Sequence, residues 1–458
     1  MARTRTVNLL EGNIFSSLAR LAVPIMATSL LQMAYNMIDM IWIGRLGADA
    51  VASIGAAGMY GWLSQAVATL ARTGGQVNAG HRLGAGEKHE AAQYAQNALQ
   101  LEVGLSVAFG LVMALFTGPL IGFFRLNGAQ VIKDAESYLL ITGGLILFST
   151  VNQVFTGLIT VTGNSRTPFA VTAVGLVLNI VLDPLLIFGL GPLPAMGVTG
   201  AAAATVLAQA LVTLLYILYA RRDTHLLCDV NILKRPDAKK MRDILRIGLP
   251  TAVQSALFTS ISMVLARTVS SFGDTAVAVQ KVGGQIESIS WMTAEGFGAA
   301  LNSFVAQNHG AGNFARAKRG FRDSLIVMTV WGVFTSLLLI LGAAPIFRIF
   351  IREAEALPLG VDYLKILGLS QLFSCIEIMT GGAFSGFGKT LPPSLNSIVL
   401  TSARIPMSMV LSSTALGLNG IWWSITVSSI LKGVVLLTLF LLFLRREGKR
   451  RGPDAASA

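Results

Sequence analysis

Hydrophobic blocks of helical length recur from one end of the chain to the other, separated by short stretches of glycine, proline and charged residues. A helix crosses a bilayer core with about 20 consecutive apolar residues, and the blocks reach that length. The pattern predicts twelve spanning helices at residues 14–43, 49–79, 89–124, 131–160, 168–190, 197–220, 243–270, 275–308, 319–350, 359–385, 392–414 and 418–444.

The second half of the chain repeats the first. A shift of 226 residues places Pro24 on Pro250 and the loop 84–86, Gly-Ala-Gly, on the identical loop 310–312. A unit with an even number of spans ends on the side of the membrane where it began, so both halves enter in the same direction. We therefore expect an all-α polytopic membrane protein, with twelve transmembrane helices in two six-helix lobes related by a parallel internal repeat.

The predicted domains are an N-terminal lobe (1–220), a cytoplasmic linker (221–242), a C-terminal lobe (243–446) and a basic cytoplasmic tail (447–458). Lysine and arginine concentrate in alternate loops, a set that includes both termini and the linker. Loops rich in these residues stay in the cytoplasm. The sequence thus predicts a multi-pass protein of the cell membrane with both termini cytoplasmic.

Composition supports membrane residence. Of 458 residues, 53% are hydrophobic and 13% are charged, about half the charged share of an ordinary soluble domain. The formal net charge of +12 comes from short basic runs between apolar blocks, which fits membrane orientation better than nucleic-acid binding. The first apolar stretch is longer than the hydrophobic region of a cleavable signal, so we expect it to remain as the first helix.

A polar stripe lies inside the first predicted span. Gln32, Tyr35, Asn36 and Asp39 follow one another at helical spacing and share one face. Such a face does not turn toward lipid. A hydrogen-bonded seam between helices would explain the amides and the tyrosine, whereas a carboxylate at membrane depth favours a functional role.

A second polar cluster lies in the fifth span. Asn179 and Asp183 are one helical turn apart, and Pro184 follows. Because proline lacks an N–H, it leaves the carbonyl four residues earlier without its helical partner. These oxygens suit Na⁺ or a proton, although a simple kink at the proline is the alternative. The repeat aligns Asp39 with Leu265 and gives Asp183 no acidic counterpart, so the predicted cation site belongs to the N-terminal half alone.

The second half has other ionisable residues at membrane depth, among them Lys281, Glu377 and Arg404. They predict either charge pairs that hold helices together or a cavity wall for cationic and amphipathic substrates. Methionines supply the adaptable surface that promiscuous sites use. The candidate substrate-cavity residues are Gln32, Met33, Tyr35, Asn36, Met37, Gln285, Met292, Glu295 and Glu377.

Patterns typical of enzymes are missing from the sequence. There is no HExxH zinc motif and no GxxxxGK[ST] phosphate loop. We therefore predict that the protein is not an enzyme, has no cofactor and is not driven directly by ATP. Pro24 and Pro250 occupy equivalent places in the first helix of each half and are candidate hinges, or static kinks.

The sequence resembles the multidrug and toxic compound extrusion (MATE) transporters along nearly its whole length. The resemblance implies two six-helix lobes that expel organic cations in exchange for Na⁺ or H⁺. It also implies cation coupling at Asp39, Asn179, Asp183 and Thr205, with a hinge at Pro24. For Na⁺, the first three of these residues would be its ligands. The segments that carry the resemblance are LARLAVPIMATSLLQMAYNMIDMIWIGRLGADAVASIG, AGHRLGAGE, VTGNSRTP, LNIVLDPLLIFGLG and MGVTGAAAAT.

In some branches of this family the second lobe has its own site, with an acid in the seventh helix. No acid lies between Thr259 and Ser270 here, which resembles the bacterial and archaeal DinF-like branch, named for a DNA-damage-inducible member. The resemblance therefore does not assign Glu377 a coupling role.

The predicted function is a cation-coupled antiporter that exports organic cations or amphipathic drugs by alternating access. We expect a monomer among membrane lipids, with no nucleic-acid partner. The alternatives are a lipid-linked oligosaccharide flippase, which needs several basic residues for its pyrophosphate, a membrane-embedded enzyme and a passive channel. The sequence leaves the choice between H⁺ and Na⁺ open.

Overall fold

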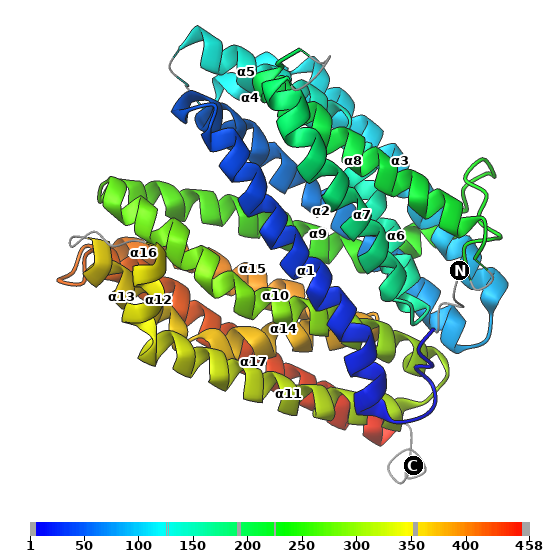
Figure 1. Cartoon of the computed structure of the whole chain (residues 1–458). Coiled ribbons are helices and arrows are strands. Elements are labelled where there is room, and N and C mark those ends of the chain that lie inside the picture. The colour runs from blue at the N-terminus through cyan, green and yellow to red at the C-terminus, as the bar shows by residue number, and fades with distance from the viewer. Residues whose placement is uncertain are drawn as a thin grey trace. The chain divides into compact units, whose positions relative to one another are not determined.

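The structure is a computed structural model that describes residues 6–124, 126, 128–189, 194–223, 226–350 and 356–450, without the side chains of Asn36, Ala48 and Asp274. The regular elements of this described part are all helices (Figure 1). They are α1 (Ile14–Gly44), α2 (Ala48–Gly84), α3 (Lys88–Leu115), α4 (Thr117–Gly122), α5 (Ala129–Gly144), α6 (Leu147–Val161), α7 (Arg166–Phe188), α8 (Gly197–Ala220), α9 (Ala238–Ser270), α10 (Asp274–Gly310), α11 (Phe314–Leu341), α12 (Ala343–Phe350), α13 (Ala356–Gly368), α14 (Gln371–Gly386), α15 (Leu391–Ser402), α16 (Arg404–Ser412) and α17 (Leu418–Arg450).

Each of the predicted spans coincides with one helix or with two consecutive helices, so the predicted fold is confirmed. Eight helical segments of the described chain are long and apolar enough to cross a bilayer, and the pair α13 and α14, bent by 46°, makes a ninth. The remaining spans are α2 and α10, which are long but less apolar, and the two short helices α15 and α16. The end of the predicted basic tail, 451–458, lies outside the described residues.

Several spans are broken at equivalent places in the two halves. The break between α3 and α4 corresponds to the break between α11 and α12, and the break between α5 and α6 corresponds to that between α13 and α14. Glycines at these breaks allow close approach of neighbouring helices: a Cβ on Gly110 would lie 2.7 Å from the Gly144 carbonyl oxygen, and one on Gly368 would lie 2.9 Å from Ile340. The sequence predicted each span as one helix because a break does not interrupt its apolar character.

The helices form two compact units. One unit contains Met1–Val7 and Ala27–Ala252, and the other contains Asn8–Met26 and Val253–Ala458. The division thus falls inside α1, two residues after Pro24, and inside α9, two residues after Pro250. The lobe boundaries predicted from the sequence stay predictions.

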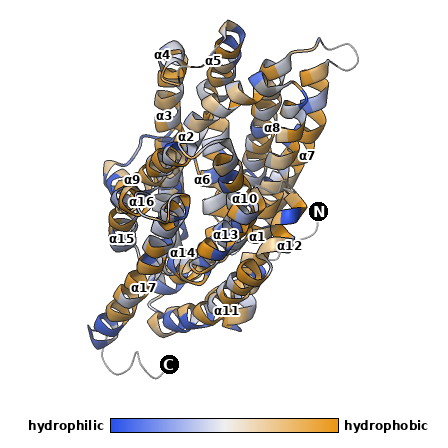
Figure 2. Cartoon of the chain, turned by 90° about the vertical axis from the view of Figure 1, so that its left-hand side faces the viewer, coloured by the Kyte–Doolittle hydropathy of each residue, from blue (hydrophilic) through white to orange (hydrophobic). Residues whose placement is uncertain are grey.

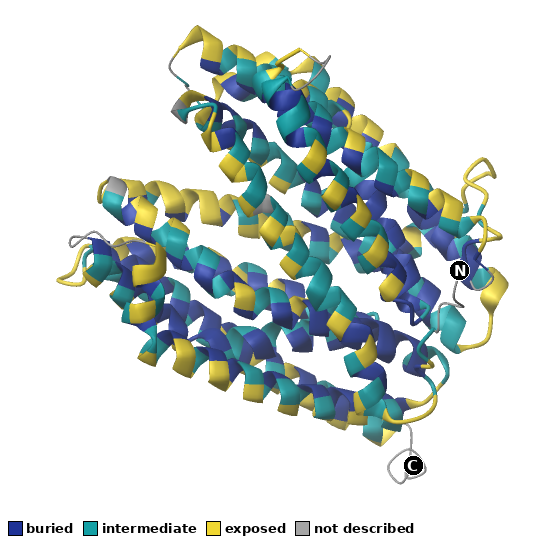
Figure 3. Cartoon of the chain, viewed as in Figure 1, coloured by how far each residue is buried: buried dark blue, intermediate teal, exposed yellow. Residues whose placement is uncertain are grey.

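The interior of each unit is apolar and closely packed. In the first unit, Tyr216 stacks on Phe155 with ring centroids 5.5 Å apart, among alanines of α2 and α3. In the second unit, Tyr363 meets Trp422 edge to face at 5.1 Å, beside the fully buried Phe347. Figure 3 shows buried residues along the inner sides of the helices and exposed residues along the outer sides.

The outer sides of the helices are also apolar. Leu115, Phe123 and Leu341 each expose more than two thirds of their surface. Figure 2 shows hydrophobic colour along the outer sides of the helices and hydrophilic colour at the ends of α11 and α17. Contiguous apolar surface of this kind needs an apolar environment, which a bilayer provides.

The segment before α9 is held to α3 by hydrogen bonds. The Asn97 side chain accepts a hydrogen bond from the backbone N–H of Asp237 at 2.8 Å, and the Tyr94 hydroxyl donates to Asp243 at 2.9 Å. Lys240 makes an ion pair with Glu90 at 3.2 Å. These contacts secure the beginning of α9 within the first unit.

The segment before α1 is held in the second unit in a related way. Arg316 of α11 donates to the backbone carbonyls of Leu9, Glu11 and Gly12, and Asn308 of α10 donates to Leu9. The 226-residue shift places Arg316 on Glu90. The same position of the repeat therefore holds the segment before a long helix in each unit, with an acidic side chain before α9 and a basic one before α1.

Asp237 caps the first turn of α9, and its loss is expected to weaken the fold slightly. Its carboxylate accepts backbone N–H groups of Lys239 and Lys240 at 2.8 and 3.3 Å. The hydrogen bond from Lys240 holds the pKa of Asp237 below its ordinary value of 3.8. Asp237→Ala should lower the thermal unfolding midpoint of the purified protein by about 1–3 °C at neutral pH.

The pH dependence of this cap follows from the lowered pKa. A carboxylate with a lowered folded-state pKa stabilises the fold at higher pH and loses that contribution as pH falls through the lowered value. The difference between wild type and Asp237→Ala should therefore be full at pH 7 and vanish only well below pH 3.8. Asp237→Asn is the matched control, because it keeps a capping oxygen without the charge; a midpoint as low as that of the alanine variant would contradict the assignment.

Candidate cation site

The polar cluster of α7 lies in the interior of the first unit. Asn179 and Asp183 expose 2% and 0% of their surface. One helical turn separates them, which lets the Asn179 amide donate to the Asp183 carboxylate at 3.2 Å. Pro184 lies within α7, which continues to Phe188. The proline therefore does not end the helix, but its nitrogen cannot donate the helical hydrogen bond to the carbonyl of Ile180.

Helix α1 brings Asp39 to the same place. The Asp39 and Asp183 carboxylates interact electrostatically. Both also interact with the phenols of Tyr35 on α1 and Tyr138 on α5. The Tyr35 hydroxyl lies 3.4 Å from the hydroxyl of Thr205 on α8. Four helices thus meet around two acids.

Three oxygen atoms of this cluster have no hydrogen-bond partner among the described residues, although all three are buried. They are Oδ1 of Asp39, Oδ1 of Asn179 and Oδ2 of Asp183. Buried polar atoms are nearly always paired in folded proteins. Carboxylate and amide oxygens are ligands that hard cations prefer, and a carboxylate also accepts a proton. The donor set therefore fits either one Na⁺ or protons.

A multivalent metal centre does not fit the described part of the chain equally well. No group of three or more histidine, cysteine, aspartate or glutamate side chains in it lies close enough to hold a metal ion. The cluster offers two carboxylates and neutral oxygens, which is suited to a singly charged ion.

The structure brings all four residues implied for cation coupling, Asp39, Asn179, Asp183 and Thr205, into one cluster. It adds Tyr138, which the sequence analysis did not single out. The available signal was a tyrosine inside a predicted span, but nothing in the sequence indicated that its side chain interacts with the carboxylates of α1 and α7.

The candidate cavity residues fall into both units. On α1, Gln32 and Met37 are exposed, and Met33 and Tyr35 are half-buried. The side chain of Asn36 lies outside the described residues. On α10 of the second unit, Gln285 and Met292 are half-buried and Glu295 is exposed. The α1 residues share a helix with Asp39, whereas the α10 residues belong to the other unit.

Glu377 and Glu287, two partly buried acids of the second unit, in contrast have basic neighbours. Glu377 of α14 forms an ion pair with Lys432 of α17 at 3.0 Å, and the two side chains expose 12% and 7% of their surface. Glu287 of α10 accepts hydrogen bonds from the Tyr363 hydroxyl at 3.3 Å and from the Gln371 amide at 3.2 Å.

Arg404 completes this arrangement. Its guanidinium donates to the hydroxyls of Ser428 at 2.6 Å and Ser429 at 2.9 Å, and it interacts electrostatically with Glu287 and Glu377. Two acids and two bases therefore balance one another. Of the two predicted roles, the geometry favours charge pairing between helices for Glu377 and Arg404. Lys281 is exposed and takes no part.

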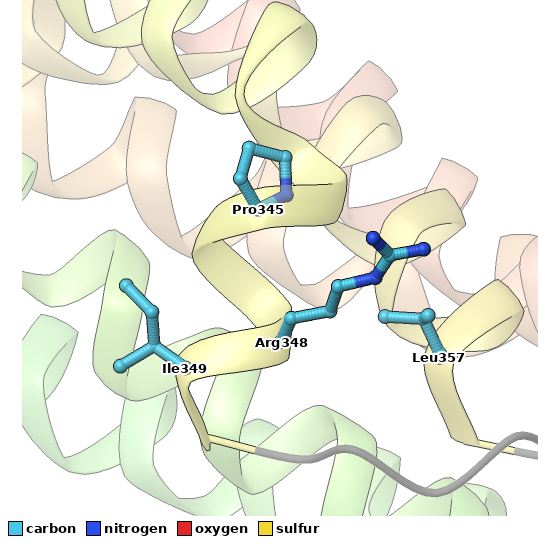
Figure 4. A pocket seen from close by; sticks show the side chains of 4 residues that line it. All are labelled: Pro345, Arg348, Ile349 and Leu357. Carbon is cyan, nitrogen blue, oxygen red and sulfur yellow. The ribbon is translucent and has the colours of Figure 1, made fainter.

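A depression of about 400 Å³ is lined by Pro345, Arg348, Ile349 and Leu357, whose side chains are drawn in Figure 4. It lies on α12 and α13 of the second unit and is open to the surroundings. Among its described lining residues the charged one is Arg348, which is exposed and has the wrong sign for binding a cation. The depression therefore does not extend the cation site.

Known proteins are similar to this chain over nearly its whole length. A family model described as MatE matches residues 24–185 and again residues 250–410. The two matches begin at Pro24 and Pro250, as the internal repeat requires. The probable multidrug resistance protein NorM of Thermotoga maritima is 30% identical over 436 residues, covering 93% of this chain and 92% of that protein. The FAD transporter of Shewanella oneidensis is 25% identical and covers 93% and 94%.

Solved structures agree in fold. A MATE crystal structure in the bent conformation has a TM-score of 0.89 at 24% identity and covers 98% of this chain and 99% of its own. A MOP superfamily transporter from Pyrococcus furiosus has a TM-score of 0.88 at 23% identity, with coverage of 97% and 99%. A structure in the straight conformation has a TM-score of 0.88 at 25% identity, with the same coverage. Family match, relatives and fold agree that the chain belongs to the MatE family and is a multi-pass membrane transporter rather than an enzyme.

Proposed function

We propose that the protein is a cation-coupled antiporter that exports organic cations or amphipathic drugs by alternating access. The observation that carries this proposal is the set of buried, unpartnered oxygens of Asp39, Asn179 and Asp183. Two carboxylates in a poorly hydrated site are costly to leave uncompensated. Binding of H⁺ or Na⁺ there, with Thr205 beside the site, changes the charge at the centre of the first unit.

The coupling step uses α1. Asp39 lies near the C-terminal end of this helix. Pro24 lies two residues before the point where the helix passes from one compact unit to the other. We take Pro24 as the hinge: cation binding at Asp39 alters the bend, repacks the cavity of the N-terminal lobe and displaces the cargo. The bent and straight conformations named for the solved MATE structures are consistent with two such states.

The proposed orientation places both termini and the linker in the cytoplasm, because basic loops favour that side. The cation then enters from outside and leaves to the cytoplasm. One elementary charge that moves inward across about 100 mV supplies about 2.3 kcal/mol, which supports a cargo gradient of about 50-fold. The protein acts as a monomer surrounded by lipid.

The charge distribution favours a cationic cargo. Two buried bases of the second unit, Arg404 and Lys432, are already balanced by Glu287 and Glu377. That leaves few cations for the pyrophosphate of a lipid-linked oligosaccharide. The names of several relatives, multidrug resistance proteins, point to the same cargo class; the named FAD transporter makes an anionic cargo an outcome to be tested.

Proteoliposomes loaded with ethidium test the proposal directly. Efflux is measured with a pH gradient alone, with a Na⁺ gradient alone and with neither. We expect one gradient to drive efflux of the dye, and that gradient identifies the coupling ion. Pro24→Ala should slow efflux under the same gradient without preventing dye binding. Efflux that is equal in all three conditions, or single-channel currents in planar bilayers, would overturn the antiport mechanism.

A further inference from the structure

A third carboxyl group lies inside the first unit, away from the cation site. Glu102 is on α3, about 21 Å along the helix from its beginning at Lys88, and exposes 0% of its surface. Its Oε1 is 2.9 Å from the Ser106 hydroxyl, which lies 2.7 Å from the Thr150 hydroxyl of α6. Its Oε2 is buried and has no described hydrogen-bond partner.

The contact between α3 and α6 around Glu102, Ser106 and Thr150, called the seam below, is tightly closed. Ser106 and Thr150 each expose 1% of their surface. One turn further along α3, a Cβ on Gly110 would lie 2.7 Å from the carbonyl oxygen of Gly144 at the end of α5. Backbones this close leave little room for water, so an ionised Glu102 would be stabilised by the hydroxyls of Ser106 and Thr150 alone among the described side chains.

No basic residue within the described part of the chain interacts with Glu102. The helices that pack against α3 are α2, α4, α5 and α6, and the segment before α9 lies along α3 as far as Gln100. Neither α4 nor α6 contains a titratable residue. The described interaction partners of Glu102 are Ser106 and Thr150. They include none of the titratable residues of α3, the helices packed on it and the segment before α9, namely Asp49, Tyr60, Arg72, His81, Arg82, Lys88, His89, Glu90, Tyr94, Lys133, Asp134, Glu136, Tyr138, Lys234, Arg235, Asp237, Lys239, Lys240, Arg242 and Asp243.

A protonated Glu102 gives the hydroxyls of Ser106 and Thr150 a more complete set of hydrogen bonds than an ionised Glu102 does. In the structure the Ser106 hydroxyl donates to the Glu102 carboxyl at 2.9 Å and lies 2.7 Å from the Thr150 hydroxyl, which donates to the carbonyl of Leu147 at 3.2 Å. Protonation of Glu102 lets the first bond reverse, so that the Glu102 O–H donates to Ser106 and Ser106 donates to Thr150. Every hydroxyl in this chain then has both a donor and an acceptor role. The second half has no such group, because the 226-residue shift aligns Glu102 with the buried Met328.

We propose that Glu102 is a further proton-binding site of the transporter, which holds its proton while the seam between α3 and α6 is closed and exchanges it when water enters the seam during transport. In the exchange, the carboxyl O–H bond breaks and the proton passes to the entering water; reprotonation reverses the step. The exchange rests on the proposed function, whereas the holding of the proton does not.

Infrared spectroscopy tests the holding of the proton. In an Asp39→Asn/Asp183→Asn background at pH 7, we expect a carboxylic-acid C=O band that disappears on addition of Glu102→Gln. Glu102→Met, which copies Met328, should remove the same band and serves if the glutamine variant folds poorly. Ser106→Ala should shift the band, and the buried Ser324→Ala should leave it unchanged. Identical spectra with and without Glu102 would overturn the proposal.

Hydrogen–deuterium exchange tests whether Glu102 exchanges its proton during transport. In wild-type proteoliposomes transferred to D₂O, the deuterium shift of the Glu102 band should be slow at rest and several-fold faster during gradient-driven dye efflux. A rate that is unchanged during measured efflux would overturn the exchange. If no dye efflux occurs at all, the proposed function fails, and the band at pH 7 still decides whether Glu102 holds a proton.

Discussion

Vesicles that contain Asp39→Asn or Asp183→Asn are expected to lose gradient-driven dye export, with the accumulation ratio falling from about 50-fold, the limit for one charge at about 100 mV, to about 1. Asparagine keeps the shape of the side chain and some of its hydrogen bonds, but it neither takes up a proton nor carries the negative charge that holds Na⁺. Because the two carboxylates interact, removing either one disables the pair.

The measurement is ethidium efflux from proteoliposomes with equal amounts of folded protein, under the gradient that drives the wild type. Asp229→Asn is the matched control, because Asp229 is an exposed residue of the segment between α8 and α9 and the substitution is chemically the same. We expect that control to transport at the wild-type rate. Export at the wild-type rate by either site variant would remove that acid from the coupling mechanism.

The second large effect concerns stability. Lys432→Met is expected to lower the free energy of unfolding by about 3–5 kcal/mol, because it leaves Glu377 as a buried charge without its ion-pair partner. Arg404 also interacts with Glu377, but its guanidinium is engaged by Ser428 and Ser429 and offsets only part of the loss.

A double variant distinguishes the cost of leaving one charge unpaired from the contribution of the complete ion pair. Lys432→Met/Glu377→Gln removes both charges, and replacement of a complete buried ion pair is often close to neutral, so most of the stability should return. Thermal unfolding in detergent measures all three proteins. Lys281→Met, on an exposed lysine of the same unit, should change little. A single variant as stable as the wild type would show that the pair does not hold α14 to α17.

The double variant also bears on transport. If Glu377 and Lys432 only hold helices together, dye export should persist once stability is restored. Loss of export in a stable double variant would instead assign Glu377 to the substrate cavity, as the sequence analysis allowed.

Local spacing predicted the parts of the site that lie on one helix. Asn179 and Asp183 are four residues apart, and helix geometry alone places them in contact, as the 3.2 Å hydrogen bond confirms. The interaction of Asp39 with Asp183 depends on where the fold places α1 and α7. Periodicity does not contain that information; the resemblance to a known family supplied it.

Residues missed by the sequence analysis share one property. Lys432 and Glu102 each stand alone in an apolar block, so each was visible as a charge at membrane depth. Their meaning depended on partners from other helices: Lys432 meets Glu377, 55 residues earlier in the chain, whereas Glu102 meets only hydroxyls. Two similar sequence signals thus correspond to a balanced ion pair and to an uncompensated acid, and only tertiary packing distinguishes them.

The division of the compact units inside α1 and α9 has a consequence for biosynthesis. The first unit includes residues up to Ala252, so it is not complete when the sixth span has been made; it must wait until the first turns of α9 have left the ribosome. Residues 8–26 are synthesised long before the rest of the second unit, to which their contacts belong, including Arg316. This segment therefore remains without its final packing partners until residues beyond Ala252 have been made, and the second unit cannot finish folding without a segment that precedes most of the first.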